Sequence, residues 1–300
     1  MKLTRLIQLC LAVAIASTAA GQEMEPRAYS PAPVGTQFVL LSYGYQSGDV
    51  LLDSSLPLKD VSINLNAASL GYGRTLNLLG RQANVAVVVP YIWGTARGTV
   101  LEDQVNVRRS GGGDVRVRFS TLIKGGEARS AEEFAGRKPS TIIGASISII
   151  VPTGQYDPAR LVNPGSNRWA FKPEMGISKP KGRWTFEANG GAWLFSANNS
   201  FLGTSRREQK PMMSLQGGVI YTLRPRMWIS GNATFYTGGS TVLNDIENAD
   251  RQKNARVGAT FSLPLNQRQS FKVVWARGVT TRIGGHLNTI AVAWQYAWSK

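Results

Sequence analysis

The sequence predicts an all-β fold, a transmembrane antiparallel up-and-down β-barrel of about twelve strands, from three observations. Its segments alternate between apolar and polar or small residues, its connections alternate between short and long, and its N-terminus is typical of an exported chain. A sheet in a bilayer must close on itself, because open edges would leave backbone groups without hydrogen-bond partners. Together these observations predict a protein of the Gram-negative bacterial outer membrane.

The N-terminal residues predict a cleaved signal peptide. Lys2 and Arg5 precede a short apolar stretch over residues 6–16, and small residues follow it. Because that stretch is too short to span a membrane as a helix, we expect a signal peptide over residues 1–21 rather than the alternative, a short anchor helix. The Pro-rich residues 22–34 are expected to form a periplasmic lead-in. The barrel would then occupy residues 35–300.

Twelve alternating segments follow along the chain. In the last one, bulky residues share one parity and become aromatic towards the chain end, while the other parity is small or polar. Lipid alone can cover such an apolar face, and its aromatic end favours the headgroup level. In order, the predicted strands are 39–45, 63–72, 83–91, 115–123, 143–149, 169–177, 184–196, 213–221, 227–236, 255–263, 271–279 and 288–298. The alternation slips near Ala67 and Ala68, which predicts a β-bulge.

The connections provide a second, independent indication. Long or polar connections are expected over residues 46–61, 94–108, 152–167, 197–210, 237–251 and 278–287. Short turns are expected over residues 76–81, 179–182, 223–225 and 264–269. This sorting by parity is typical of barrels with short periplasmic turns and longer external loops. Residues 124–139 depart from it, since a long connection stands where a short turn is due, and residues 131–135 predict one helical turn there.

Composition restricts the chemistry and the partners. Removing Lys2 and Arg5 leaves 32 basic and 18 acidic residues, a formal charge of +14. Such a charge indicates an anionic partner, either lipopolysaccharide or anionic solutes, or simply basic loops at an anionic membrane surface. Export argues against nucleic acid. Cys10, the only cysteine, lies in the signal peptide, and His286 is the only histidine, so no metal site and no cofactor are expected.

The polar parity of the strands is expected to face the lumen, because arginine facing lipid at the midplane costs about 2–4 kcal/mol. The candidate lumen-lining residues are Arg116, Arg118, Arg168, Lys172, Glu174, Arg256 and Lys272. One interpretation is a cationic path that favours anions or carboxylated solutes. The other is an internal salt-bridge network, in which Glu174, Glu187 and Asp114 pair with the arginines of a plugged barrel. Both interpretations remain open at this point.

Catalysis is not expected. His286 and Ser166 both fall in predicted external loops, and nothing in the sequence brings a base, a nucleophile and an orienting group within hydrogen-bond reach. An outer-membrane enzyme that acts on lipid through His286 is the alternative from another class. A closed structural barrel that binds partners through its loops is a third hypothesis.

Several motifs resemble a known family. They are Val89-Pro90-Tyr91, Gly113-Asp114-Val115-Arg116, the run from Val151 to Asp157, the run from Asn167 to Glu174, the lead-in from Pro26 to Gly35, and the terminal Tyr296 and Trp298. Together they resemble the outer-membrane transporter family named after the meta-cleavage pathway of phenol degradation, over nearly all of the mature chain. The chain departs from typical barrels in ending on Ser299-Lys300 rather than on an aromatic residue.

The resemblance implies a channel-like barrel that helps aromatic or other small carbon sources to cross the outer membrane, and it carries over no catalytic residue. We therefore expect a channel or transporter that passes small solutes, aromatic or anionic organic compounds among them, by passive diffusion. The expected partners are these solutes, outer-membrane lipid and lipopolysaccharide, and the barrel-assembly machinery. The expected state is a monomer or a weak homo-oligomer.

Overall fold

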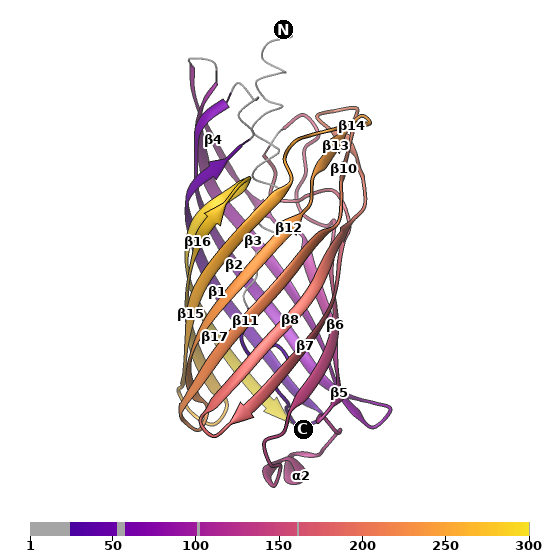
Figure 1. Cartoon of the computed structure of the whole chain (residues 1–300), viewed down its shortest axis with the longest axis vertical. Coiled ribbons are helices and arrows are strands. Elements are labelled where there is room, and N and C mark those ends of the chain that lie inside the picture. The colour runs from indigo at the N-terminus through magenta and orange to yellow at the C-terminus, as the bar shows by residue number, and fades with distance from the viewer. Residues whose placement is uncertain (1–24, 53–57, 101–102, 161, 300) are drawn as a thin grey trace.

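A single antiparallel sheet wraps into a closed barrel, longer than it is wide, with strands tilted across its wall (Figure 1). The computed structural model describes residues 25–52, 58–100, 103–160 and 162–299. The predicted signal peptide over residues 1–21 lies outside these residues. Among the described residues, no helix is both long and apolar enough to cross a membrane.

The barrel has twelve strand positions, as predicted. Its strands are β1 (Thr36–Leu51), β2 (Leu58–Leu78), β3 (Arg81–Val100), β5 (Val115–Lys124), β6 (Ile142–Val151), β7 (Ala170–Lys181), β8 (Trp184–Phe195), β11 (Met212–Arg224), β12 (Met227–Gly238), β15 (Gln252–Pro264), β16 (Gln269–Thr281) and β17 (Gly284–Ser299). A further strand, β4 (Asp103–Gly112), pairs with one part of β3 while β5 pairs with the other, so β4 and β5 share one position.

The first and last strands close the barrel. β1 pairs with β2 on one side and with β17 on the other, and the β1–β17 register runs without a shift from Thr36 opposite Ser299 to Leu51 opposite Gly284. The terminal aromatic run of β17 is therefore paired on both edges, since β16 covers its other side. Pairing of β1 with β17 and of β2 with β3 closes the sheet, and closure is the condition for a sheet to enter a bilayer.

The two ends of the barrel differ, as the connections predicted. The lower end in Figure 1 carries the C-terminus, short turns and the one long connection, in which α2 (Ala131–Ala135) is the expected helical turn, capped by Ser130 and Glu133. The upper end carries a small sheet of β9 (Asn198–Phe201), β10 (Ser205–Gln209), β13 (Thr241–Leu243) and β14 (Ile246–Glu247). By the rule for such barrels, the lower end is periplasmic and the upper end extracellular.

Three upper connections are shorter than predicted. β1 extends to Leu51, β3 extends to Val100, and β16 and β17 meet in a tight turn between Thr281 and Gly284. The extended connection expected over residues 278–287 is therefore wrong, and His286 lies in β17 opposite Asp49 rather than in a loop. These strands stay paired as hairpins beyond the apolar belt. Their outward-facing polar side chains are in water there, so they do not prevent strand pairing.

The β-bulge predicted at Ala67 and Ala68 is also wrong. The pairing of β2 with β1 continues without a shift through these residues. The alternation changes because the environment changes: in the upper barrel Ile63 faces inward and is buried, while outward Asn64 accepts a hydrogen bond from Tyr45. Ile63 belongs to an apolar cluster inside the upper barrel with Val50, Val61, Ala96 and Leu287. The interior beside this part of β2 is therefore apolar.

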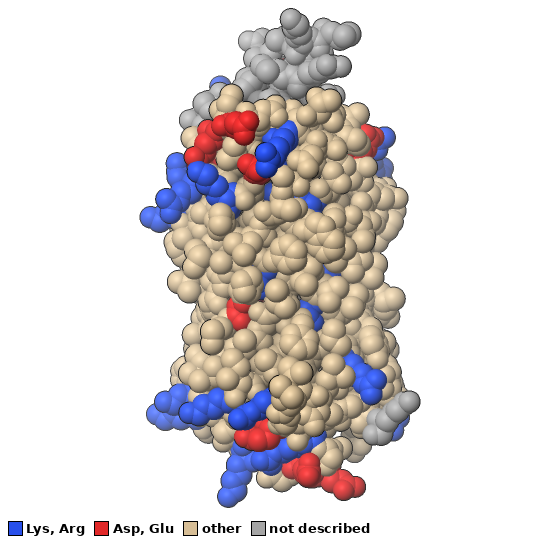
Figure 2. All heavy atoms as spheres, turned by 90° about the vertical axis from the view of Figure 1, so that its right-hand side faces the viewer, with Lys and Arg blue, Asp and Glu red and all other residues tan. Residues whose placement is uncertain are grey.

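A belt of apolar side chains surrounds the middle of the barrel. Figure 2 shows Lys, Arg, Asp and Glu gathered towards the two ends of the molecule, with few on the band between them. Aromatic residues stand at both borders of this belt. Tyr91 packs near Trp93 on the upper side, and Trp294, Tyr296 and Trp298 follow one another on the lower side. This is the surface of a barrel that spans an outer membrane.

Candidate functional site: the barrel lumen

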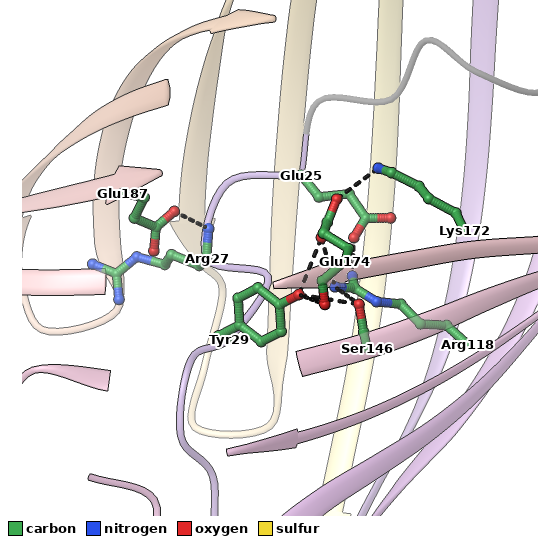
Figure 3. Close-up of polar contacts among 8 residues, drawn as sticks. All are labelled: Glu25, Arg27, Tyr29, Arg118, Ser146, Lys172, Glu174 and Glu187. Atoms are coloured by element: carbon green, nitrogen blue, oxygen red, sulfur yellow. Dashed lines mark hydrogen bonds and ion pairs between the residues drawn. The ribbon is translucent and has the colours of Figure 1, made fainter. Parts of the chain in front are cut away.

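Residues 25–30 cross the lower lumen, and we call them the lumen segment (Figure 3). On one wall, the Arg27 backbone N–H donates to Glu187 Oε2 of β8 at 2.8 Å, and Arg27 Nη2 donates to Thr222 Oγ1 of β11 at 3.2 Å. The Arg27 guanidinium also lies 5.1 Å from the ring centroid of Trp228 in β12. The segment thus contacts three adjacent strands on this side.

Tyr29 contacts the adjoining strands β6 and β7 and is 3 % exposed. Its hydroxyl lies 3.0 Å from Ser146 Oγ and donates to Glu174 Oε1 at 3.1 Å. Two glycines make room for the ring: Gly144 of β6 stands directly opposite Gly176 of β7. A Cβ added to either glycine would lie 2.2 or 2.4 Å from a ring carbon of Tyr29. The glycine pair therefore forms a seat shaped for this ring.

An ion network surrounds the tyrosine. Lys172 Nζ lies 2.6 Å from Glu174 Oε2, and Arg118 Nη2 lies 3.6 Å from Glu174 Oε1. Arg118 also forms an ion pair with Glu25 of the lumen segment. Two cations and two carboxylates thus balance each other inside the lower barrel (Figure 3). A balanced, hydrogen-bonded network is the condition under which buried charge is tolerated.

The chain between the lumen segment and β1 is fixed at the lower end. The Ala32 N–H donates to Gln82 Oε1, the Val34 N–H donates to the Arg129 carbonyl, both at 2.8 Å, and Thr75 Oγ1 donates to the Pro33 carbonyl. The predicted lead-in over residues 22–34 begins outside the described residues, so its boundary stays a prediction. Its described part does not stay outside the barrel, because residues 25–30 contact lumen-facing side chains.

A cavity of about 270 Å³ lies in the upper barrel, and we call it the upper cavity. Its lining is mainly apolar and includes Leu65, Ile92, Val107, Ile150, Val162 and Phe195. Arg109, Arg116 and Arg168 also line it. The upper cavity is therefore an apolar space with cationic groups at its wall, unlike the ion network below.

The connection over residues 152–169 forms part of the cavity wall, and Asp114 holds it in place. Asp114 Oδ1 accepts a hydrogen bond from the Gly154 N–H at 2.9 Å. Its Oδ2 accepts from the Ser166 N–H at 2.8 Å and from Ser166 Oγ at 2.5 Å. Gly154 and Gly165 approach so closely that a Cβ on either would lie within 3 Å of the other's backbone. This arrangement fixes the connection against the barrel mouth.

Arg168 lies at the end of that connection and is 4 % exposed. Its Nη2 donates to Gln209 Oε1 of β10 at 2.6 Å, and its guanidinium lies 4.5 Å from the centroid of the Phe195 ring. Burial, followed by the positive charge of nearby Arg207, lowers the pKa of Arg168 to about 9. Arg168 is thus a buried cation whose observed partners are an amide and a ring.

The seven residues predicted to line the lumen all project inward. Arg116 and Arg168 line the upper cavity, whereas Arg118, Lys172 and Glu174 belong to the lower ion network. On the other wall, Arg256 Nη2 donates to Thr289 Oγ1 at 2.9 Å, and Lys272 is inward-facing on β16. Their role in a solute path stays a prediction. The lumen segment and the fixed connection were not predicted, although the motifs containing Tyr29, Asp114 and Arg168 had been singled out.

The residues considered for catalysis are not brought together. His286 Nδ1 lies 3.3 Å from Thr281 Oγ1, and Ser166 Oγ donates to Asp114. Neither contact places a histidine beside the serine, which nucleophilic catalysis by such a pair requires.

Comparison with known proteins agrees with this architecture. A family model described as "Putative MetA-pathway of phenol degradation" matches residues 43–293. The crystal structure of an outer membrane channel from Pseudomonas putida F1 aligns with 92 % of this chain and 100 % of its own, with a TM-score of 0.75 and 19 % identity.

Two autotransporter barrels are less similar. The transport unit of AIDA-I from Escherichia coli aligns with 97 % of this chain and 98 % of its own, with a TM-score of 0.51 and 10 % identity. The β domain of BrkA from Bordetella aligns with 88 % and 100 %, with a TM-score of 0.51 and 11 % identity. At these identities the likeness establishes the barrel fold. No curated protein matches this chain.

Proposed function

This chain belongs to the family described as the putative MetA pathway of phenol degradation, and on that premise we propose that it is an outer-membrane channel for small solutes. Solutes would cross by passive diffusion, and the protein would act without catalysis. The expected surroundings are outer-membrane lipid and lipopolysaccharide, with insertion by the barrel-assembly machinery and a monomeric or weakly oligomeric state.

The observation that carries this proposal is the polarity of the lumen wall. Most inward-facing positions of β12 and β15 are polar, namely Ser230, Asn232, Thr234, Asn254, Arg256, Thr260 and Ser262. A barrel that served only as a packed scaffold could fill this space with apolar side chains. A polar interior is what a hydrated path through a membrane requires. The low exposure of these residues supports a narrow path, and hence small solutes.

The upper cavity supports a finer proposal about the solutes. Its apolar walls favour molecules with an apolar body, and its arginines favour anions. Aromatic or anionic organic compounds have one or both of these properties. Sugars and inorganic ions have no apolar body, so they would pass without being retained.

The lumen segment supports a proposal about closure. Its contacts span six consecutive strands, half of the barrel wall, from β5 through β6, β7, β8 and β11 to β12, which supports the proposal that it obstructs the lower lumen. Passage then depends on displacement of this segment, which would break its hydrogen bonds and ion pairs together. A closed structural barrel is the second candidate, because the same contacts would favour it if the segment never moved.

Liposome swelling tests the proposal. Proteoliposomes would be placed in iso-osmotic neutral sugars of increasing size and, separately, in salts of small organic acids. Swelling that falls with solute size is expected for a narrow channel. If the barrel is folded, as judged by heat-modifiable gel mobility, but no solute causes swelling, the channel proposal fails and the closed barrel replaces it.

A further inference from the structure

We propose that the upper cavity is a binding site for a small carboxylate with an apolar body of about one aromatic ring, whose carboxylate is held by Arg168. This proposal rests on the proposed function, since it names the class of solute that would be retained on the path. Three properties of the cavity support it: its size, its donor groups and its apolar walls.

The size of the cavity matches one aromatic ring with a substituent. An apolar cavity of roughly 150 Å³ engineered in another protein admits benzene. The upper cavity measures about 270 Å³. The additional volume suffices for a carboxylate and a bound water, but it is too small for two fused rings with long side chains. The cavity is also mainly apolar, as ligand sites of this size usually are.

The donor that would bind the carboxylate is already oriented. The Arg168 guanidinium packs over Phe195, and its Nη2 is fixed by Gln209. Gln209 is itself held, because its Nε2 donates to the Gly239 carbonyl at 3.0 Å. The other terminal nitrogen, Nη1, is buried and has no hydrogen-bond partner among the residues that the structure describes. A buried charged donor without a partner is costly, and an anion would remove that cost.

The charges around Arg168 favour an anion. Arg207 is 5 % exposed, and its Nε and Nη2 also lack hydrogen-bond partners in the described part of the chain. Burial of Arg168, and then repulsion by the positive charge of Arg207, lowers the pKa of Arg168. Asp114 is the acidic residue in the cavity lining, and its oxygens already accept three hydrogen bonds from the connection over residues 152–169. Asp250 is the carboxylate that interacts electrostatically with Arg207.

The apolar walls decide which anions would bind. Leu65 of β2 and Ile92 of β3 line the cavity together with Val162. An inorganic anion such as chloride or phosphate would lose its hydration on entering the cavity and has no apolar surface to bury against these walls. An aromatic or branched body would instead bury apolar surface there, at about 25 cal/mol per Å². The site is therefore expected to prefer organic carboxylates to inorganic anions.

Equilibrium binding of benzoate to the full barrel in lipid nanodiscs tests this proposal, with empty nanodiscs subtracted. Benzamide serves as the matched neutral ligand, because it has the same shape and no charge. We expect benzoate to bind at least tenfold more tightly than benzamide, and acetate and chloride to bind weakly. Equal binding of benzoate and benzamide would overturn the proposal.

Two variants locate the site. Arg168→Met removes the donor and keeps the volume, and it should weaken benzoate binding about tenfold to a hundredfold while leaving benzamide unchanged. Arg160→Met is the matched control, because Arg160 lies in the same connection but is exposed and paired with Asp157. It should change benzoate binding by less than twofold. Benzoate binding unchanged by Arg168→Met would overturn the assignment of the donor.

A third variant keeps the test decisive if Arg168→Met does not fold. Ala67 lines the cavity on β2, so Ala67→Phe should fill part of the space and keeps Arg168 in the chain. It should abolish binding of benzoate, and binding despite it would overturn the proposal. The result is separable from the channel proposal. Swelling without benzoate binding would refute this site alone, whereas benzoate binding without swelling would refute the channel alone.

Discussion

Arg118 and Arg168 both face the lumen, yet they stand in two regions that handle charge in opposite ways. In the lower region, Arg118 lies against the carboxylates of Glu25 and Glu174, and Lys172 completes a balanced network around Tyr29. In the upper region, Arg168 has an amide and an aromatic ring as its observed partners, within an apolar cavity. Charge in the lower barrel thus holds a segment in place, whereas we propose that the buried charge of the upper barrel binds a ligand.

The largest loss in the free energy of unfolding is expected from Glu174→Ala in the lower network. Without Glu174, Lys172 and Arg118 lose their shared partner and Tyr29 loses a hydrogen-bond acceptor. Loss of one partner from a buried pair costs about 3–5 kcal/mol. Urea unfolding from lipid vesicles should show a loss of that order. Glu127→Ala is the control, because Glu127 forms ion pairs that are exposed, and such pairs contribute about 0–1 kcal/mol. Equal losses for the two variants would contradict the network's role.

Gly144→Ala should separate closure from folding. Its Cβ would overlap the Tyr29 ring, and overpacking of this kind costs about 1–3 kcal/mol. The barrel can avoid that cost by releasing the lumen segment, which should raise ion conductance. Tyr29→Ala in the same chain should restore the lost stability, and this is measured by a double-mutant cycle. Gly231→Ala is the control, since its Cβ would meet no atom within 4 Å. An unchanged conductance in Gly144→Ala would show that the ring does not obstruct the path.

Asp114→Asn should loosen the wall of the upper cavity. The amide keeps the size of the side chain, but it replaces one of the two accepting oxygens and removes the negative charge. Hydrogen bonds to charged groups contribute about 1.5–3 kcal/mol, so part of that should be lost. Hydrogen exchange at the Gly154 and Ser166 amides should become faster, while exchange in β11 and β12 stays the same. Unchanged exchange at both amides would contradict the role given to this carboxylate.

The smallest effect on stability is expected from Arg168→Met. Replacing a buried arginine that has an unpartnered donor by an apolar side chain of similar length should leave the free energy of unfolding within about 1 kcal/mol, or raise it. Urea unfolding under the conditions used for Glu174→Ala gives the direct comparison. A loss as large as that of Glu174→Ala would mean that the upper arginine is structural, like the lower ones.

The fold was predictable because inward-facing and outward-facing residues alternate along each strand of a barrel. Strict alternation around Pro173 was enough to identify β7 although proline lacks a backbone N–H. The cost of placing arginine in lipid was enough to predict that the charged residues face the lumen. The prediction of a β-bulge at Ala67 was wrong for a physical reason. At this residue β2 leaves the apolar belt, so its inward face becomes apolar and its outward face becomes polar. Alternation reports the environment of each face, and it cannot distinguish a slip in register from a change of environment.

The site was less predictable, because its main contacts join residues far apart in the chain. Nothing local connects Tyr29 with Gly144 and Gly176, or Asp114 with Ser166, although Tyr29 and Asp114 lie in motifs that the sequence had indicated. One of the two open interpretations paired Glu174, Glu187 and Asp114 with arginines. Glu174 does pair with Arg118. Asp114 instead accepts hydrogen bonds from Gly154 and Ser166, and Glu187 accepts from the Arg27 backbone N–H and Ser178 Oγ. The cationic interpretation stays a prediction. It concerns the upper cavity, where Arg168 meets no carboxylate oxygen within hydrogen-bonding distance among the described residues.

The central claim is that the lumen segment closes a path that the barrel wall leaves open, and single-channel recording in a planar bilayer under a salt gradient tests it most directly. Wild-type protein should give small, anion-selective conductance steps. Gly144→Ala should give larger conductance steps, with a reversal potential of the same sign. Identical conductance in the two proteins, or silence in both with folding confirmed by heat-modifiable mobility, would contradict the account.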